Sequence, residues 1–207
     1  GFVGPSDKNN AFVGHYGLEE FYETALAGVT GAAQDGAIVE PVPGSDLTLT
    51  IDPNIQAAAE RILEKTVSER NAKGGSVIVE DPKTGKILAM ASNPAFDPND
   101  YQQSPVASFL NPAVQHVYEP GSIMKVITMS AGIDSGAITP KTTFYDSGEL
   151  KLNGRTIKNW DLKAHGTVTM TQVIEGSLNT GAAFAERTTG HEVFRGYLEK
   201  FGFGKKT

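Results

Sequence analysis

The chain has 207 residues and a formal net charge of −6, with 39% hydrophobic residues, 20% charged residues and no cysteine. These values fit a globular protein of one sizeable domain, or one domain and part of another. The acidic balance argues against a nucleic-acid partner, and the lack of cysteine excludes disulfides, thiolate zinc sites and cysteine nucleophiles. No apolar run approaches bilayer-spanning length and no signal peptide opens the chain, so we expect a cytosolic protein or one whose targeting segment has been removed.

The first 44 residues are rich in glycine and proline and carry little predicted regular structure. One helix is predicted over Leu18 to Ala27, closed by Gly28, and a short hairpin is predicted to turn at Asp35-Gly36. The segment Pro41-Val42-Pro43-Gly44 has the composition of a linker. We therefore expect a domain boundary near residue 44.

The pattern changes after this linker. Residues 47–51, LTLTI, alternate between apolar and polar in the manner of a strand. Asp52 and Pro53 are good residues for the N-cap and the first position of a helix, which we expect to run to about Arg70. Two further strands, 75–80 and 86–92, are predicted to form a hairpin around the turn Asp81-Pro82-Lys83-Thr84-Gly85.

The second half of the chain is predicted to be mainly helical. A helix begins near Ser122, after the helix-breaking pair Pro120-Gly121, and short strands that turn at Asn153-Gly154 follow it. Three more helices are expected, over about 169–175, 180–188 and 192–201. This order of elements predicts an α+β fold in which helices pack on an antiparallel sheet.

A serine and a lysine three residues apart begin the helix SIMKVITMSAGI, at Ser122 and Lys125. Positions i and i+3 lie on one helix face, so the hydroxyl and the amine can meet. The helix is apolar on nearly every side, which is typical of a buried helix. Burial lowers the pKa of an ammonium group, and the neutral amine can then activate a serine as a nucleophile.

Simpler roles are open for both residues. Ser122 can cap the helix, and Lys125 can extend its ammonium group to the surface. A serine three residues before a lysine is a common pair, so the motif depends on its context. Histidines are scattered without metal-like spacing and no phosphate-binding glycine loop is present, so neither a metal nor a cofactor is expected.

Six segments, in the right order, resemble the class B penicillin-binding proteins, which are serine D,D-transpeptidases that cross-link bacterial peptidoglycan. They are GHYGLEEFYETALAG, DLTLTIDPNIQAAAE, GGSVIVEDPKTGKILAMASNPAFDPN, NPAVQHVYEPGSIMKV, HGTVTMTQVIEGSLNTGAA and FGFGKKT. The resemblance implies a penicillin-binding/β-lactamase-like transpeptidase domain. Residues 1–44 are expected to be the end of a non-catalytic pedestal domain and a linker, and residues 45–207 the N-terminal portion of the transpeptidase domain.

The resemblance also implies roles for four residues in two active-site motifs. Ser122 is expected to attack the penultimate D-alanine carbonyl of a stem peptide, with Lys125 as its general base. Ser177 is expected to pass the proton to the leaving D-alanine, and Asn179 to bind Lys125 or the substrate amide. An amine of a second stem peptide would resolve the acyl-enzyme, and a β-lactam would acylate Ser122 in the same way.

A third motif of the family, Lys-Thr-Gly, is expected after the second motif, on a strand beside the nucleophile. The same letters occur at Lys83-Thr84-Gly85, but they precede the nucleophile and suit a turn, so we interpret them as part of the hairpin. The functional copy, with one oxyanion-hole N–H group, would lie beyond Thr207. These 207 residues are therefore expected to be C-terminally truncated and inactive alone.

The resemblance implies D-Ala-D-Ala stem peptides and β-lactams as ligands, and divisome or elongasome proteins as partners. It implies a membrane anchor upstream of this chain and a catalytic domain on the extracytoplasmic side of the bacterial cell membrane. Two other functions are open. A β-lactamase or β-lactam sensor would lack the pedestal-like segment, and a non-catalytic cell-wall-synthesis scaffold would not need the four site residues intact.

Overall fold

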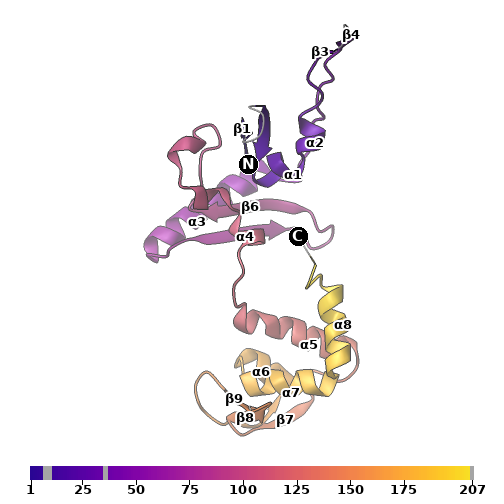
Figure 1. Ribbon diagram of the computed structural model, residues 1–207. Coiled ribbons are helices and arrows are strands. Elements are labelled where there is room, and N and C mark those ends of the chain that lie inside the picture. The colour runs from indigo at the N-terminus through magenta and orange to yellow at the C-terminus, as the bar shows by residue number, and fades with distance from the viewer. Residues whose placement is uncertain (7–10, 35–36, 206–207) are drawn as a thin grey trace. The chain divides into compact units, whose positions relative to one another are not determined.

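The computed structural model describes residues 1–6, 11–34 and 37–205, and its contacts divide the chain into two compact units, Gly1–Val117 and Tyr118–Thr207 (Figure 1). Helices and antiparallel strand pairs occur in both units. The α+β class predicted from the sequence is confirmed. The predicted turn at Asp35-Gly36 lies outside the described residues.

The start of the first unit is built from short elements. The strands are β1 (Phe2–Pro5), β2 (Phe12–His15), β3 (Ala32–Gln34) and β4 (Ala37–Val39), paired antiparallel as β1–β2 and β3–β4. The helix predicted over Leu18 to Ala27 is instead two short helices, α1 (Gly17–Phe21) and α2 (Glu23–Leu26). Tyr22, between them, leaves the helical conformation with φ −104° and ψ 15°, which ends the first run of helical backbone.

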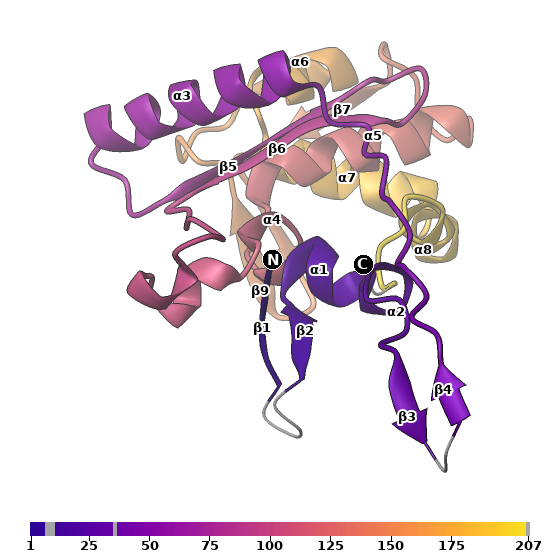
Figure 2. The same cartoon turned by 90° about the horizontal axis from the view of Figure 1, so that it is seen from above.

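A helix on a hairpin forms a buried cluster of the first unit. Helix α3 (Pro53–Glu69) begins as predicted, because Asp52 Oδ1 accepts the N–H groups of Asn54 (2.8 Å) and Ile55 (3.1 Å). Strands β5 (Gly75–Glu80) and β6 (Ile87–Asn93) form the predicted hairpin. Figures 1 and 2 show α3 lying along this hairpin, and the residues buried between them are Ala59, Leu63, Ala89 and Ala91.

The strand predicted over residues 47–51 is not formed, and that prediction is wrong. Two hydrogen bonds tie the end of this stretch to β6, from Thr50 Oγ1 to Ile87 O (2.6 Å) and from Asp52 N to Leu88 O (2.9 Å). A strand needs a run of paired backbone groups, and no such ladder reaches this stretch in the described part of the chain. The alternating pattern alone does not supply that partner.

Lys83-Thr84-Gly85 lies in the turn between β5 and β6, as predicted. The carboxylate of Asp81 accepts hydrogen bonds from the Lys83 amide (2.9 Å) and the Thr84 hydroxyl (2.7 Å). Gly85 adopts φ +72°, a conformation that glycine takes without strain. These three residues therefore shape a turn.

Short helical turns and an aromatic cluster complete the first unit. The turns are η1 (Tyr101–Gln103), η2 (Val106–Phe109) and α4 (Pro112–Gln115). Phe2 stacks on Tyr101 with ring centroids 3.9 Å apart, and the edges of Phe96 and Phe109 meet its ring. Such ring contacts add to the free energy gained by burial.

The second unit combines helices with two small antiparallel strand pairs, and Figure 1 shows β7, β8 and β9 beside α6 and α7. Its helices are η3 (Gly121–Ile123), α5 (Met124–Asp134), α6 (Met170–Glu175), α7 (Asn179–Thr189) and α8 (His191–Lys200). Its strands are β7 (Thr143–Asp146), β8 (Glu149–Leu152), β9 (Arg155–Lys158) and β10 (Gly166–Thr169), paired as β7–β10 and β8–β9. Asn153 and Gly154 both take positive φ, 48° and 74°, and so form the predicted turn between β8 and β9.

The start of α6 agrees with the helix predicted from about residue 169. Thr169 and Gln172 form a capping box that begins α6.

The hydrophobic core of the second unit contains Met129, Ile138, Val168, Met170, Val173, Leu178 and Ala185. Among the described residues, no helix combines the length and the apolar character needed to cross a bilayer.

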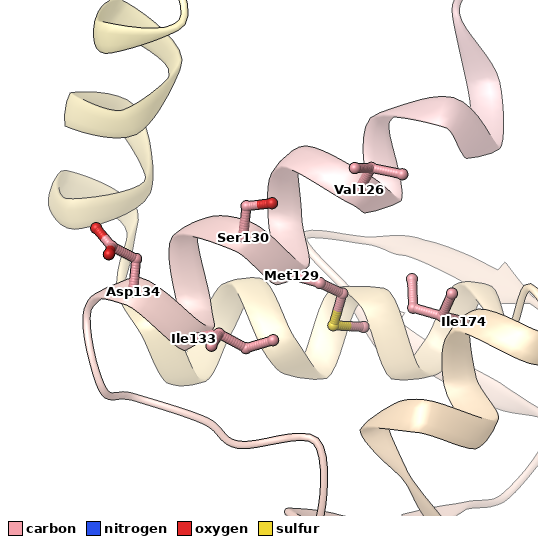
Figure 3. Close-up of a pocket in the computed structure, with 6 residues that line it drawn as sticks. All are labelled: Val126, Met129, Ser130, Ile133, Asp134 and Ile174. Carbon is pink, nitrogen blue, oxygen red and sulfur yellow. The ribbon is translucent and has the colours of Figure 1, made fainter. Parts of the chain in front are cut away.

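Helix α5 is not buried on every side, contrary to the expectation from its sequence. Its buried residues are Lys125, Thr128, Met129, Ala131 and Gly132. Val126 is 62% exposed and Ile133 is 45% exposed, and with Ile174 of α6 they line an apolar pocket (Figure 3). The helices α6, α7 and α8 contact α5 and account for its buried side.

Replacing Gly181 by alanine should destabilise the second unit. A Cβ atom at Gly181 would lie 2.4 Å from Cγ2 of Val173, a core residue with no exposed surface. Overpacking of this kind costs about 1–3 kcal/mol, more than the roughly 1 kcal/mol of helix propensity that alanine adds. Urea unfolding of the variant should therefore show a lower midpoint.

The matched control is Gly196→Ala in α8, where an added Cβ meets nothing within 4 Å. This variant should keep or raise the urea midpoint, because it gains helix propensity without a clash. Equal shifts of the midpoint in both variants would show that close packing of α7 on α6 is not what requires Gly181.

Candidate active site

Lys125 is the centre of a small polar cluster in the second unit. It lies in the first turn of α5 with only 9% of its surface exposed. Its Nζ donates to the carbonyl oxygen of Ser177 (2.6 Å), to Oγ of Ser177 (3.1 Å) and to Oδ1 of Asn179 (2.7 Å). An ammonium group has three donors and no acceptor, so each of its N–H groups has a partner here.

The electrostatics of Lys125 are those of an amine removed from water. Burial lowers the pKa of the Lys125 ammonium group below its ordinary value. Within the described ranges no carboxylate forms an ion pair with it. Lys125 therefore gives up a proton more readily than a surface lysine does.

Ser177 and Asn179, which bond to Lys125, lie on either side of a buried residue. Leu178, 3% exposed, belongs to the core and has the extended dihedrals φ −74° and ψ 123°. This core residue lies between the two residues that bond to Lys125, and it anchors the segment that carries them. Ser177 itself adopts φ +50°, which is uncommon for a residue other than glycine.

Ser122 lies on the turn that precedes this cluster. It is an exposed residue of η3, which leads directly into α5, and it follows Gly121 at φ +62°. Its hydroxyl makes no hydrogen bond in the part of the chain that the structure describes. The structure thus brings three of the four predicted residues, Lys125, Ser177 and Asn179, into contact, and places Ser122 one helical turn before the lysine.

A second polar cluster is linked to the first through Asn179, and it was not predicted from the sequence. Asp146, Asn159 and Thr180 are buried, each at most 1% exposed. Asp146 accepts hydrogen bonds from Asn159 Nδ2 (2.7 Å) and Thr180 Oγ1 (2.8 Å), and Oδ1 of Asn159 accepts the N–H of Asn179 (3.0 Å). These residues are 13 to 34 positions apart, a spacing that no local rule singles out.

His165 closes this cluster on its exposed side. Its Nδ1 lies 2.7 Å from Asp146 Oδ2 and its Nε2 lies 3.0 Å from Asp161 Oδ2. The hydrogen bond to Asp146 raises the pKa of His165 above its ordinary value. Burial by itself raises the pKa of Asp146, but hydrogen bonds from Gly148, His165, Thr180 and Asn159 lower it, and the pKa ends below its ordinary value.

The described residues hold no group of three or more histidine, aspartate or glutamate side chains that could hold a metal ion. The side chains around Lys125 are a hydroxyl and an amide, which suit proton transfer and hydrogen bonding. A buried amine, a second hydroxyl in contact with it and an exposed serine one turn away can together support acyl transfer.

Comparison with known proteins agrees with this arrangement. Residues 75–207 match the penicillin binding protein transpeptidase domain. Stage V sporulation protein D of Bacillus subtilis is 34% identical over 94% of this chain, which spans 32% of that protein. Peptidoglycan D,D-transpeptidase MrdA of Escherichia coli is 30% identical over 94% of this chain, which spans 34% of that protein.

Solved structures of similar proteins also match this chain. The crystal structure of Pseudomonas aeruginosa PBP2 in complex with WCK 5153 matches with a TM-score of 0.77 and 28% identity, covering 99% of this chain and 48% of that one. A protein of Atopobium parvulum matches with a TM-score of 0.82 and 33% identity, covering 96% of this chain and 46% of that one. The chain belongs to the penicillin-binding proteins of class B, whose transpeptidase domain it matches.

The pair of His165 and Asp146 should give the protein a pH-dependent stability. The raised pKa of His165 contributes stability that is complete below its ordinary value of 6.5 and is lost as the pH rises through its folded-state pKa. The lowered pKa of Asp146 contributes stability that is complete above 3.8 and is lost as the pH falls through its folded-state pKa. The thermal midpoint should therefore be highest between these two values.

Replacing His165 by glutamine should flatten the decline of the thermal midpoint on the alkaline side. His191→Gln, at an exposed histidine of the same unit outside this cluster, is the matched control and should leave the decline in place. If the two variants follow the same pH profile as each other, the pair of His165 and Asp146 is not its origin.

Proposed function

We propose that this chain supplies the nucleophile and the general base of a serine-type peptidoglycan D,D-transpeptidase, which β-lactams acylate at Ser122. One observation carries the proposal. Lys125 is a buried amine with a lowered pKa, held by Ser177 and Asn179 one helical turn from an exposed serine. The relative named peptidoglycan D,D-transpeptidase MrdA supports the substrate class.

In the proposed reaction, neutral Lys125 takes the proton of the Ser122 hydroxyl as its oxygen attacks the penultimate D-alanine carbonyl. The tetrahedral intermediate collapses, the peptide C–N bond breaks, and the terminal D-alanine leaves as an amine that has gained a proton. An amine of a second stem peptide then attacks the ester carbonyl, the bond from the acyl carbon to Ser122 Oγ breaks, and the proton lost by the amine returns to Ser122. The new amide bond is the cross-link. A β-lactam follows the first step, and its opened ring stays attached to Ser122.

Ser177 is proposed to carry the proton between Lys125 and the leaving amine. Its Oγ lies 3.1 Å from Lys125 Nζ, within hydrogen-bonding distance for a direct transfer. A hydroxyl both donates and accepts, so Ser177 can receive one proton and release another in the same step.

Asn179 is proposed to hold the base, since both ends of its amide are engaged within the protein. Its Oδ1 accepts from Lys125, and its Nδ2 donates to the carbonyl oxygen of Lys158 (2.8 Å). The second bond fixes the orientation of the amide with its oxygen toward the lysine. Of the two roles predicted for Asn179, this geometry favours binding to Lys125.

The remaining assignments are proposals that follow from the family. Residues 1–44 are proposed to be the end of the pedestal domain and its linker, and residues 45–207 to belong to the transpeptidase domain. The proposed ligands are D-Ala-D-Ala stem peptides and β-lactams. The proposed setting is the extracytoplasmic side of the bacterial cell membrane, with a membrane anchor and with divisome or elongasome proteins as partners.

Fluorescent penicillin should label the full-length gene product at Ser122, and the variant Ser122→Ala should lose the label completely, because no other group would form the ester. Ser130→Ala is the matched control, since Ser130 lies in α5, into which the turn of Ser122 leads, and is also exposed (Figure 3). It should be labelled like the wild type. Peptide mass spectrometry locates the adduct, and an adduct on any other residue would contradict the proposal.

The rate of acylation should rise with pH, because only the neutral amine of Lys125 acts as a base. The rise should level off below pH 10.5, the ordinary pKa of a lysine, since burial lowers the pKa of Lys125. Lys125→Arg keeps the positive charge but cannot lose its proton, and the rate should fall by about 100-fold or more. Stopped-flow acylation across pH measures both effects, and an arginine variant with wild-type rates would exclude Lys125 as the base.

A further inference from the structure

The turn that carries Ser177 and Asn179 is held at both ends by one neighbouring segment, residues 158–160. The indole Nε1–H of Trp160 donates to the carbonyl oxygen of Gly176 (3.0 Å), just before the turn. Oδ1 of Asn159 accepts the N–H of Asn179 (3.0 Å), just after it. The backbone of this segment takes part as well, since the Lys158 carbonyl oxygen accepts from Asn179 Nδ2.

The turn needs this support for two reasons. Ser177 at φ +50° is in a strained conformation, which persists only where the surroundings determine it. Helix α7 also starts without a cap of its own, because its N-cap residue is Leu178, which has no side-chain acceptor.

Asn159 supplies the missing cap from 20 residues away in the sequence. Its Oδ1 accepts the N–H groups of both Asn179 (3.0 Å) and Thr180 (3.3 Å), the first two residues of α7. These N–H groups have no partner inside their own helix. One side-chain oxygen therefore determines where α7 begins, and with it the direction in which Asn179 points.

The buried carboxylate of Asp146 fixes the orientation of the Asn159 amide. Asn159 Nδ2 donates to Asp146 Oδ2 (2.7 Å), so the amide oxygen is directed to α7. The single proton of the Thr180 hydroxyl is directed to Asp146 Oδ1 (2.8 Å), with Asn159 Oδ1 as a second, more distant acceptor (3.0 Å), and this bond ties the helix to the cluster. The remaining bonds to this carboxylate come from the Gly148 amide (2.9 Å) and from His165.

We propose that Asp146, Asn159, Trp160 and Thr180 form a positioning clamp, which sets Ser177 and Asn179 at the distances from Lys125 that the acyl-transfer step requires. None of the four contacts the Lys125 amine, so the clamp acts through the turn it holds. Its kinetic part depends on the proposed function, and its geometric part does not. In the full-length enzyme, loosening the clamp slows acylation of Ser122 without weakening the initial binding of the β-lactam.

The test compares two Thr→Val substitutions on the same helix. Thr180→Val keeps the shape of the side chain and removes the hydroxyl that bonds to Asp146 and Asn159. Thr189→Val is the matched control, because Thr189 is also buried in α7 but its hydroxyl bonds only within the helix, to Ala185 O (2.8 Å). Thr180→Ser restores the hydroxyl at the clamp.

Two measurements are made on the full-length gene product and its variants. The first is hydrogen exchange of the Asn179 amide by NMR, which reports the clamp whether or not the protein is acylated. The second is the acylation of Ser122 by a fluorescent penicillin over a range of concentrations, which separates the binding constant from the first-order acylation rate. Thermal midpoints and the labelled fraction correct for any unfolded protein.

Thr180→Val should speed exchange of the Asn179 amide and slow the acylation rate, each by about tenfold, which is the effect of one lost hydrogen bond. The binding constant should stay within about twofold of the wild-type value. Thr180→Ser should bring the exchange rate of the Asn179 amide and the acylation rate most of the way back to the wild-type values. Thr189→Val should change neither rate. Equal effects of Thr180→Val and Thr189→Val would overturn the clamp, as would wild-type exchange in Thr180→Val. Faster exchange in Thr180→Val with an unchanged acylation rate would overturn the role of the clamp in acylation. A wild-type protein that penicillin does not label would refute the proposed function but not the clamp.

Discussion

The second unit is organised around one requirement, the satisfaction of a buried ammonium group. Lys125 has little contact with water and no carboxylate beside it within the described residues, so its three protons need three neutral acceptors. None of these acceptors belongs to its own helix. All come from Ser177, in the turn between α6 and α7, and from Asn179, the first residue of α7. The placement of that turn is therefore as important to the site as the lysine itself.

The position of that turn depends on contacts with residues further away in the sequence. Leu178 anchors it in the core, but as an N-cap residue leucine leaves the first N–H groups of α7 open. Asn159 fills this role, and Asp146 orients Asn159. A buried carboxylate is costly unless it is fully hydrogen-bonded, and Asp146 has bonds from four residues. The polar cluster thus supplies the acceptor for the start of α7 that Leu178 does not have.

The features that were predictable from the sequence are those that neighbours in the chain decide. Asp52 caps α3, and Thr169 with Gln172 begins α6, because each cap lies within three residues of the groups it satisfies. Residues 47–51 failed as a strand because a strand depends on a distant partner. In the same way, helix spacing already pointed to Ser122 and Lys125, and the family resemblance added Ser177 and Asn179. Asp146 and Asn159, by contrast, act across the fold and leave no local pattern.

The distances around Lys125 also suggest how the resting arrangement leads into the proposed reaction. The three contacts engage all three N–H groups of the ammonium form, and the Ser122 hydroxyl is not among them. The neutral amine that acts as the base has only two N–H groups, so one of the three contacts is given up when the proton is lost. The longest of the three contacts, 3.1 Å, is the one with the Ser177 hydroxyl. Longer hydrogen bonds are generally weaker, so this contact is the least costly to exchange. Asn179 and the Ser177 carbonyl then keep the amine in place, and the hydroxyl that is set free is the one proposed to carry the proton onward.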